Sequence, residues 1–395
     1  MTEGRTYWRG VVSALCAVLI GIGLARFGYT PLIPALIAEG WFSPSDAAYL
    51  GAANLAGYLV GALATKRLLG FGTATGLLRT MMALAVASFF ACALPWGFTW
   101  YFVWRFMSGC AGGTLMALAA PTAMLSVPDD RRGIAGGAIF TGVGLGIALS
   151  GTLVPLLLTY GLAVTWVGLG LLSLALAVIA WFGWGAARSA PSRQAAAPDR
   201  GISVGWPLVA IFVAYAFDAA GIVPHTVFIV DFVARGLDRG LASGASYWVL
   251  LGAGALVGAL IAGWFADRAG FAAATRVALA LQALAVLLPA VTTAPVALGV
   301  SCVILGAFVP GIVPLVLGRV QEMLPGDRGA QRTAWGHATA AFALGQAVAG
   351  YGFSWLFEQS GYAYLFWLGA AAMLLGLVVD GAVSLAKTHG RRFSG

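Results

Sequence analysis

The sequence predicts an all-α integral membrane protein with twelve transmembrane helices in two six-helix halves and both termini in the cytoplasm. Three observations predict this fold class. The chain is 61% hydrophobic and only 9% charged, its apolar runs are long enough to cross a bilayer, and its basic residues lie mostly on one side of these runs. A soluble domain carries about 25% charged residues, so this chain has too few to cover a surface in contact with water.

Twelve apolar runs approach or exceed the roughly 20 residues that a helix needs to cross the hydrocarbon core. They are residues 8–37, 47–69, 72–94, 98–125, 133–159, 162–185, 204–232, 243–266, 271–288, 295–324, 330–357 and 362–386. A polar stretch rich in Ala, Pro, Ser and Arg separates the sixth run from the seventh. We therefore predict an N-terminal six-helix bundle over residues 1–185, a cytoplasmic linker over 186–203 and a C-terminal six-helix bundle over 204–395.

The positions of Lys and Arg orient these helices, because the cytoplasmic loops of membrane proteins are enriched in both residues. With the N-terminus in the cytoplasm, 18 of the 22 basic residues fall on the cytoplasmic side and only Arg235 and Arg239 fall on the opposite side. The remaining two, Arg26 and Arg105, fall inside predicted helices. A missing or an additional helix would mix the two groups.

Composition and motifs exclude several other classes of protein. The net charge of +8 is spread between apolar runs rather than gathered on one basic face, so it predicts no nucleic-acid partner. Cys16, Cys92, Cys110 and Cys302 lie in apolar stretches without a Cys-x-x-Cys motif, which predicts neither a disulfide framework nor a metal site. A phosphate-binding loop of the form GxxxxGK[ST] is absent, which argues against an ATP-driven pump. We expect no cofactor and no metal.

Two short motifs recur in the two halves. Gly28-Tyr-Thr-Pro31 in the first predicted helix corresponds to Gly221-Ile-Val-Pro224 in the seventh, and Val60-Gly-Ala-Leu63 in the second corresponds to Val257-Gly-Ala-Leu260 in the eighth. Chance is the alternative explanation, because such tetrapeptides are common in an apolar chain. Two six-helix halves joined by a linker are nevertheless the arrangement of transporters that rock around a central site.

Longer motifs resemble one family of transporters. Gly263-Trp-Phe-Ala-Asp267-Arg268-Ala-Gly270 resembles the cytoplasmic loop between helices 8 and 9 in the major facilitator superfamily, and Arg105-Phe-Met-Ser-Gly109 resembles its fourth-helix pattern. The segment Gly23-Leu-Ala-Arg26-Phe-Gly-Tyr29-Thr-Pro31-Leu-Ile-Pro34 is similar to the first helix of the YbfB/YjiJ-like branch. The superfamily resemblance covers nearly the whole chain.

This resemblance implies the major facilitator fold, with alternating access by rocking of the two halves. It also implies a conformational latch made by Asp267 and Arg268, in which the aspartate holds the end of a neighbouring helix. The sequence departs from the family pattern at Thr65, where the first half is expected to carry the corresponding aspartate. The glycine-rich stretch of the fifth predicted helix, residues 137–151, resembles the corresponding helix of the family but lacks the proline that is usual in its antiporters.

Arg26 lies in the first predicted helix with apolar turns on both sides. A charged side chain at the centre of a transmembrane helix costs about 2.5–3.5 kcal/mol, so it needs an interior partner or a water-filled cavity. One interpretation is that Arg26 binds an anionic substrate, a carboxylate, through its two-pronged guanidinium. The other is a permanent ion pair that locks the halves together. Tyr29, one turn further on, is predicted to share the substrate site, in a segment kinked by Pro31 and Pro34.

Asp218 occupies nearly the equivalent position in the seventh predicted helix, one residue from that of Arg26 when Gly28 is aligned with Gly221. We predict that Asp218 pairs with Arg26 in the empty site, and that it changes partner or takes up a proton when substrate binds. His225 lies two turns further along the same face and is a second candidate for proton coupling, because histidine titrates near neutral pH. The alternative is a neutral histidine that makes a single hydrogen bond.

The remaining candidates are polar residues inside predicted helices. Arg105 supports proton coupling in the family that the sequence resembles, or it bonds backbone carbonyls as a structural residue, and the sequence fits both roles. Asn54, Tyr58 and Gln346 are predicted to bind substrate, with a bridge between neighbouring helices as the alternative for the two amides.

These features together predict a proton-coupled secondary transporter of a small organic anion in the inner membrane, and not an enzyme. Its predicted partners are a small-molecule substrate, protons and the lipid bilayer, and it is expected to be a monomer. Proton-driven efflux of amphiphilic or cationic drugs is the alternative, with Asp218 as the cation site. A membrane enzyme that uses Asp218 and His225 as acid and base is less well supported, because the chain offers few polar groups at membrane depth.

Overall fold

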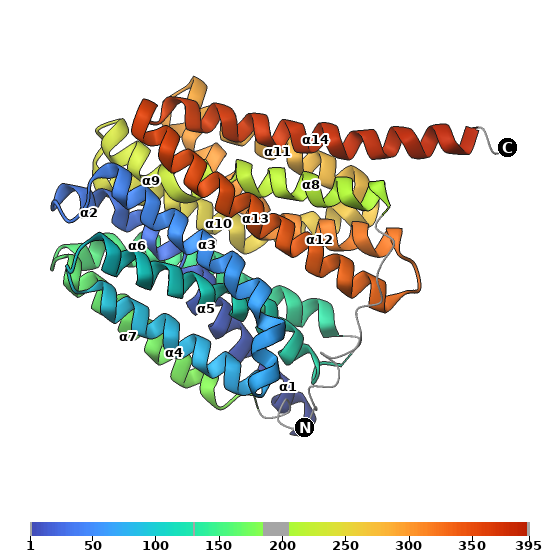
Figure 1. The fold of residues 1–395 in the computed structure, drawn as a ribbon, viewed down its shortest axis with the longest axis horizontal. Coiled ribbons are helices and arrows are strands. Elements are labelled where there is room, and N and C mark those ends of the chain that lie inside the picture. Colours follow the sequence, from blue (N-terminus) through green and yellow to red (C-terminus); the bar gives the residue numbers. More distant parts are fainter. Residues whose placement is uncertain (1, 129–130, 185–204, 393–395) are drawn as a thin grey trace.

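The computed structural model describes residues 2–128, 131–184 and 205–392, and in these residues all regular structure is helical (Figure 1). The predicted linker, residues 186–203, lies outside the described residues. The first part of the chain forms α1 (Thr2–Val18), η1 (Leu19–Leu24), η2 (Phe27–Leu32), α2 (Ile33–Ala38), α3 (Pro44–Leu68), η3 (Leu69–Phe71), α4 (Ala74–Cys92), α5 (Phe98–Met124), α6 (Arg132–Leu158) and α7 (Leu162–Trp181).

The second part of the chain also begins with an interrupted helix. It forms α8 (Trp206–Gly221), η7 (Pro224–Phe228), α9 (Ile229–Asp231), η8 (Phe232–Gly236), α10 (Gly240–Ala269), α11 (Phe271–Val291), α12 (Pro295–Met323), α13 (Arg328–Ser360) and α14 (Ala363–Arg392). Here η1, η7 and η8 are π-helices, whereas η2 and η3 are 3₁₀-helices.

Ten segments in the described part of the chain are long and apolar enough to cross a membrane. Two further predicted spans, 98–125 and 330–357, form α5 and α13, which have 27 and 33 residues but are less apolar than the ten. Large apolar side chains such as Leu260, Leu284 and Val348 are more than half exposed on the outer surface. A surface of this kind is suited to lipid rather than to water.

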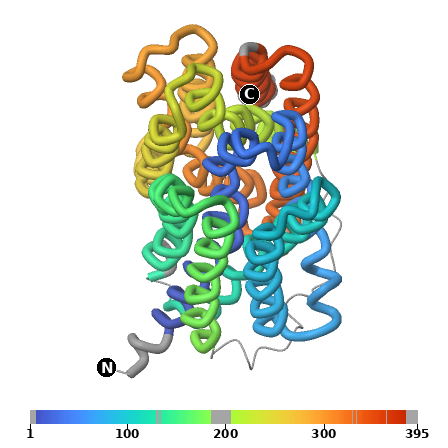
Figure 2. The backbone as a smooth tube through the Cα atoms, turned by 90° about the vertical axis from the view of Figure 1, so that its left-hand side faces the viewer, coloured from blue at the N-terminus to red at the C-terminus, as the bar shows by residue number. Residues whose placement is uncertain are grey.

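The packing of the second six long helices repeats that of the first six. In the first set, α3 packs on α5, α4 packs on α5 and α7, and α1 packs on α5, α6 and α7. In the second set, α10 packs on α12, α11 packs on α12 and α14, and α8 packs on α12, α13 and α14. Figure 1 and the end view in Figure 2 show the two sets as two adjoining layers. The layers meet where α3 packs on α13 and where α6 packs on α10. Each contact joins the second long helix of one set to the fifth long helix of the other, so the two contacts are equivalent.

Glycines bring two pairs of helices into backbone contact. A Cβ atom at Gly61 of α3 would overlap the backbone of Cys110 in α5, and a Cβ atom at Gly258 of α10 would overlap the backbone of Ala307 in α12. Gly258 and Ala307 each follow their counterparts Gly61 and Cys110 by 197 positions. The two close contacts are therefore equivalent, as expected of two repeats, and they include the predicted Val-Gly-Ala-Leu match.

The contact between α6 and α10 is also made by small residues. Gly144 of α6 lies against the backbone of Ala255 in α10, and Gly252 of α10 lies against the backbone of Ala148 in α6. Near the same contact, the Trp248 indole donates a 3.0 Å hydrogen bond to the Ser150 hydroxyl. The two layers thus approach closely along this pair of helices.

Candidate functional site

The first transmembrane segment is broken where Arg26 lies. The α-helix α1 continues into η1, turns at Ala25 and Arg26, and resumes as η2, which contains Pro31. Proline lacks an amide hydrogen and cannot continue a regular helix without losing a hydrogen bond, which explains the irregular backbone after the turn. Before the turn, Gly21 and Gly23 allow α5 and α6 to approach the backbone of η1 closely. The break therefore lies between packed helices rather than against lipid, as irregular backbone within a membrane requires.

Arg26 projects from this break into a small interior cavity. Its guanidinium lies 4.8 Å from the ring centre of Phe27 and 5.5 Å from that of Tyr58. It makes neither a hydrogen bond nor an ion pair within the described part of the chain. The cavity has a volume of about 20 Å³ and is lined by Arg26, Tyr29, Thr30, Gly51, Asn54, Leu55, Arg105, Thr226 and Val227. Such a volume holds about one water molecule, so little free space remains in the cavity in this conformation.

Arg105 adds a second cation to the same cavity. The side chain is buried, its Nη1 donates a 2.7 Å hydrogen bond to the carbonyl oxygen of Ala25, and its guanidinium lies 4.2 Å from the ring centre of Tyr29. Its Nε has no hydrogen-bond partner among the described residues. Arg105 therefore bonds a backbone carbonyl at the break, as the structural interpretation of the sequence predicts, and it also faces the cavity.

Three more predicted substrate residues surround Arg26 and Arg105. Asn54 is buried and donates to the Arg105 carbonyl at 3.2 Å, whereas its Oδ1 has no partner among the described residues. Tyr29 is buried and donates a 2.9 Å hydrogen bond to the carbonyl of Ala47. Tyr58 contacts Arg26 through its ring. The structure thus brings together Arg26, Tyr29, Asn54 and Tyr58, and it adds Arg105.

Gln346, in α13, is also buried, and neither its amide nitrogen nor its amide oxygen has a partner in the described part of the chain. Gly350 lies one turn further along the same helical face and contacts Ala52 and Leu55 of α3. Gln346 is therefore on the face of α13 that is directed at α3. A buried amide without partners destabilises the protein by about 1–3 kcal/mol per unsatisfied group, so this position is suited to a ligand.

Asp218 lies in a different environment from Arg26. It is fully buried in α8, its Oδ1 accepts a 2.8 Å hydrogen bond from Gln282 of α11, and its Oδ2 has no partner among the described residues. The predicted ion pair between Asp218 and Arg26 is not formed in this structure. The two positions differ by one residue in the alignment of the repeats, and one residue turns a side chain by about 100° around a helix. Asp218 consequently faces α11, whereas Arg26 faces α3.

His225 lies in the π-helix η7 and does not share a cavity with Asp218. Its Nε2 lies 2.6 Å from the hydroxyl of Ser301, and that hydroxyl donates a 2.6 Å hydrogen bond to the carbonyl of Ala285. A serine hydroxyl has only one proton, so Nε2 of His225 must donate to Ser301. Nδ1 is buried without a partner among the described residues. This single hydrogen bond matches the alternative that the sequence leaves open for His225, whereas its predicted role in proton coupling stays a prediction.

The predicted latch residues lie at the end of α10. Asp267 is exposed and makes no ion pair with a described residue. Arg268 turns back on its own helix, where it donates to the carbonyl of Trp264 at 3.1 Å and lies 3.9 Å from the ring centre of that residue. Gly270 follows with φ of +81°, a conformation that favours glycine and begins the next helix. Within the described residues, the structure thus shows no ion pair of Asp267 that would correspond to the latch implied by the resemblance.

Two buried acidic clusters were not predicted from the sequence. Asp380 in α14 bonds Arg319 at 2.7 Å and Arg276 at 3.1 Å. Asp231 in α9 pairs with Arg235 at 2.5 Å and accepts a 2.5 Å hydrogen bond from the Tyr362 hydroxyl. The two clusters lie on opposite sides of the break in the seventh segment, because Asp380 lies near Asp218 before the break and Asp231 follows it. Both aspartates interrupt predicted apolar runs, 362–386 and 204–232, and that interruption is the signal that identifies them.

The layers also contact each other near the end of the bundle that carries α2 and α9, away from the described ends of α1 and α14 (Figure 1). Thr30 of η2 donates a 2.5 Å hydrogen bond to the carbonyl of Thr226 in η7. The rings of Tyr49 in α3 and Tyr351 in α13 lie 6.3 Å apart. Thr30 and Thr226 both line the Arg26 cavity, so their hydrogen bond joins the two layers at this cavity.

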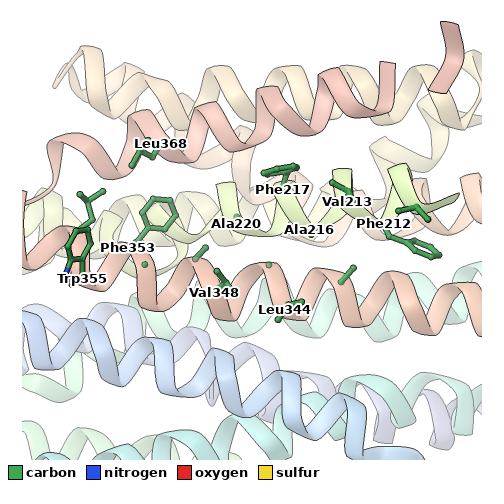
Figure 3. A pocket seen from close by; sticks show the side chains of 16 residues that line it. Phe212, Val213, Ala216, Phe217, Ala220, Leu344, Val348, Phe353, Trp355 and Leu368 are labelled. Atoms are coloured by element: carbon green, nitrogen blue, oxygen red, sulfur yellow. The ribbon is translucent and has the colours of Figure 1, made fainter. Parts of the chain in front are cut away.

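A larger apolar groove runs between α8, α13 and α14, as Figure 3 shows. It has a volume of about 770 Å³, and two of its lining residues, Val348 and Trp355, are more than half exposed on the outer surface, whereas Phe212 and Phe353 are buried. The lining is aliphatic and aromatic, without the convergent polar groups that orient a small molecule. The groove is therefore part of the lipid-facing surface, and the chemistry-bearing residues lie in the much smaller cavities inside.

An all-helical chain with ten candidate membrane spans, a broken first helix and cations directed into an interior cavity defines the class of multi-pass membrane transporters. The family model described as uncharacterised MFS-type transporter YbfB matches residues 18–381, and the chain belongs to this family of major facilitator transporters. No curated protein matches the chain. The family confirms the predicted YbfB-like branch and a function in transport rather than in enzymatic catalysis.

Proposed function

We propose that this protein is a proton-coupled secondary transporter of a small organic anion, a carboxylate, in the inner membrane. The observation that carries the proposal is Arg26, a cation without an acidic or hydrogen-bonding partner among the described residues, directed into a cavity that Thr226 and Val227 also line. A permanent ion pair, the other interpretation of this arginine, has no counterpart within the same residues. An anionic substrate would supply the missing partner.

The electrostatics of the cavity support an anion over a cation. Arg26 and Arg105 both line it, and its other polar side chains, Tyr29, Thr30, Asn54 and Thr226, are neutral. Two cations near each other in a medium of low dielectric repel, and a bound carboxylate reduces this repulsion while it accepts paired hydrogen bonds from a guanidinium. A cationic drug would meet the opposite field, which is the reason that we do not favour efflux of cationic drugs.

Alternating access by rocking of the halves 1–185 and 204–395 is supported by the repeated packing of the two sets of helices. We take α5 and α13 as the two spans that complete a set of twelve, because each packs beside segments that are apolar enough to cross the membrane. The described ends of α1 and α14 lie at the same end of the bundle, which fits both termini in the cytoplasm (Figure 1). Contacts on the opposite side, and an Asp267 without an ion-pair partner among the described residues, fit a state closed toward the outside.

Proton coupling is assigned to Asp218, with His225 and Arg105 as further candidates. Asp218 is a buried carboxyl group whose Oδ2 has no partner among the described residues, so a proton on that oxygen would offset the cost of burying a charge. It belongs to α8, which is the structural counterpart of α1, and Arg26 lies at the break that follows α1 and η1. Movement of the seventh segment provides a connection between proton binding and the Arg26 cavity, because Thr226 and Val227 line that cavity.

The test is thermal stabilisation of the purified protein by a panel of small carboxylates and a panel of cationic amphiphiles. A ligand at 100 times its Kd stabilises the folded state by about 2.7 kcal/mol. We expect a carboxylate to stabilise the wild type and not Arg26→Ala. The matched control is Arg79→Ala, because Arg79 also contacts an aromatic ring, that of Trp181, but is only partly buried and lies outside the cavity.

Arg79→Ala should respond to the carboxylate like the wild type. Stabilisation by cationic amphiphiles alone, whatever residue occupies position 26, would overturn the anion proposal in favour of efflux. A carboxylate identified in this way is then tested in proteoliposomes, where uptake should depend on an imposed pH gradient.

A further inference from the structure

The cavity that holds Asp218 also contains a cation, and this cation is Arg319 of α12. The cavity has a volume of about 10 Å³ and is lined by Ile211, Ala214, Tyr215, Asp218, Thr275, Leu279, Ile312, Val316, Arg319 and Asp380. This volume is at the lower limit for a single water molecule. Asp218 and Arg319 thus face the same enclosed space, although no ion pair joins them in this conformation.

Asp380 holds Arg319 together with a second arginine. Arg319 Nη1 lies 2.7 Å from Oδ1 of Asp380, and Arg276 Nε lies 3.1 Å from Oδ2 of the same carboxylate. The Asp380 side chain is 1% exposed and that of Arg319 is 5% exposed, whereas that of Arg276 is 35% exposed. If Arg319 turned away, Asp380 would still be paired with Arg276. Arg319, which lines the Asp218 cavity, can therefore change partner without leaving a buried carboxylate uncompensated.

The other groups around Asp218 leave Arg319 as its available counter-ion. Tyr215 comes from the same helix, Gln282 and Thr275 come from α11, and Asp380 comes from α14. Helix α13 contributes no residue to this cavity. Arg26 lines the other cavity and not this one.

We infer that Arg319 is the counter-ion of ionised Asp218 and exchanges between Asp380 and Asp218 as Asp218 loses and regains its proton. On deprotonation the O–H bond of the carboxylic acid breaks, the electron pair stays on the carboxylate, and the proton passes to a water molecule in the cavity. Arg319 then pairs with Asp218, while Arg276 compensates Asp380. The inference rests on the proposed role of Asp218 in proton coupling, and it separates the cavity for the proton from the cavity for the anion.

Infrared titration of the purified protein tests this inference without any substrate. The C=O stretching band of a protonated carboxyl group that disappears in Asp218→Asn reports the protonation of Asp218. In Arg319→Gln the carboxylate loses its counter-ion, so the band should persist to a higher pH, by about 1–3 pH units for an arginine at close range. Asp380→Asn should release Arg319 to Asp218, so the band should disappear at a lower pH than in the wild type. Arg319→Lys keeps the charge and should restore most of the wild-type behaviour.

The matched control is Arg235→Gln, which breaks the other buried aspartate–arginine pair, with Asp231, outside the Asp218 cavity. It should lower thermal stability and leave the Asp218 band at its wild-type midpoint. An unchanged midpoint in both Arg319→Gln and Asp380→Asn, or an equal shift in the control, would overturn the inference. If Arg319→Gln does not fold, Asp380→Asn and Arg319→Lys decide.

This test and the test of the proposed function fail separately. If no titrating band is lost in Asp218→Asn, both the proton-coupling role of Asp218 and the role of Arg319 are wrong, while binding of an anion at Arg26 still stands or falls by thermal stabilisation. If carboxylates do not stabilise the wild type, the anion proposal fails, and the infrared titration still reports whether Arg319 is the counter-ion of Asp218.

Discussion

Thr30 of the broken first segment donates its hydroxyl proton to the backbone carbonyl of Thr226 in the broken seventh segment, at 2.5 Å. The bond joins the 3₁₀-helix η2 to the π-helix η7, and each of these interrupts an otherwise regular helix. Both residues line the Arg26 cavity. The irregular backbone of each half therefore meets the other half directly at the candidate substrate site, and opening this end of the bundle requires this bond to break.

Thr30→Val should make that end open more often, because valine has nearly the same shape as threonine and lacks the hydroxyl. The net loss of one hydrogen bond is worth about 1 kcal/mol, which corresponds to a roughly fivefold larger open population. Hydrogen exchange of the peptides that cover η2 and η7 checks this, with faster exchange expected in the variant. Thr30→Ser keeps the donor and is the control; equal exchange in Thr30→Val and the wild type would contradict the prediction.

Gly258→Ala should destabilise the protein, because the added Cβ atom would overlap the backbone of Ala307. Overpacking of this kind typically costs about 1–3 kcal/mol, and here the obstacle is backbone rather than a flexible side chain. Gly263→Ala is a control in the same helix, since a Cβ atom at Gly263 meets no neighbour within 4 Å. Thermal unfolding in detergent should show a lower midpoint for Gly258→Ala alone, and the prediction fails if the two alanine variants unfold together.

Ser301→Ala should leave the Nε2–H of His225 without its acceptor. An unsatisfied buried donor destabilises the folded state by about 1–3 kcal/mol. Nitrogen-15 NMR of labelled histidine should identify the Nε2-protonated tautomer in the wild type, because Ser301 already donates its proton to Ala285. A wild-type spectrum of the Nδ1-protonated tautomer would refute this assignment.

Asp231→Asn and Asp267→Asn should differ strongly in their effect on stability. Asp231 is buried and paired with Arg235, and removal of one partner of a buried pair costs about 3–5 kcal/mol; we expect the lower end because Arg235 is 29% exposed. Asp267 is exposed and unpaired with any described residue, so its substitution should change the unfolding free energy by less than about 0.5 kcal/mol. Equal destabilisation by the two substitutions would mean that Asp267 has a partner in the populated state.

The sequence is sufficient to predict the helices, the interior position of Arg26 and the kink after it, because apolar length, an isolated charge and proline each act locally. It is not sufficient to predict which groups meet. The alignment of the repeats relates Asp218 to Arg26 with an error of one residue, and one residue changes the face of a helix. Nor does the sequence reveal the partners of the buried polar groups: Asp218 bonds Gln282 of α11, and His225 bonds Ser301 of α12.

The small residues that line α6 and α10 have a mechanical consequence. Gly144, Ala148, Gly252 and Ala255 bring the backbones of the two helices close together, so a relative shift of the halves needs little rearrangement of these four side chains. The glycine contacts of α3 with α5 and of α10 with α12 bring backbones together in the same way within each half. A methyl group added at Gly144 or Gly252 would overlap the backbone of the opposite helix, so it would push the two halves apart at this contact and hinder their relative movement.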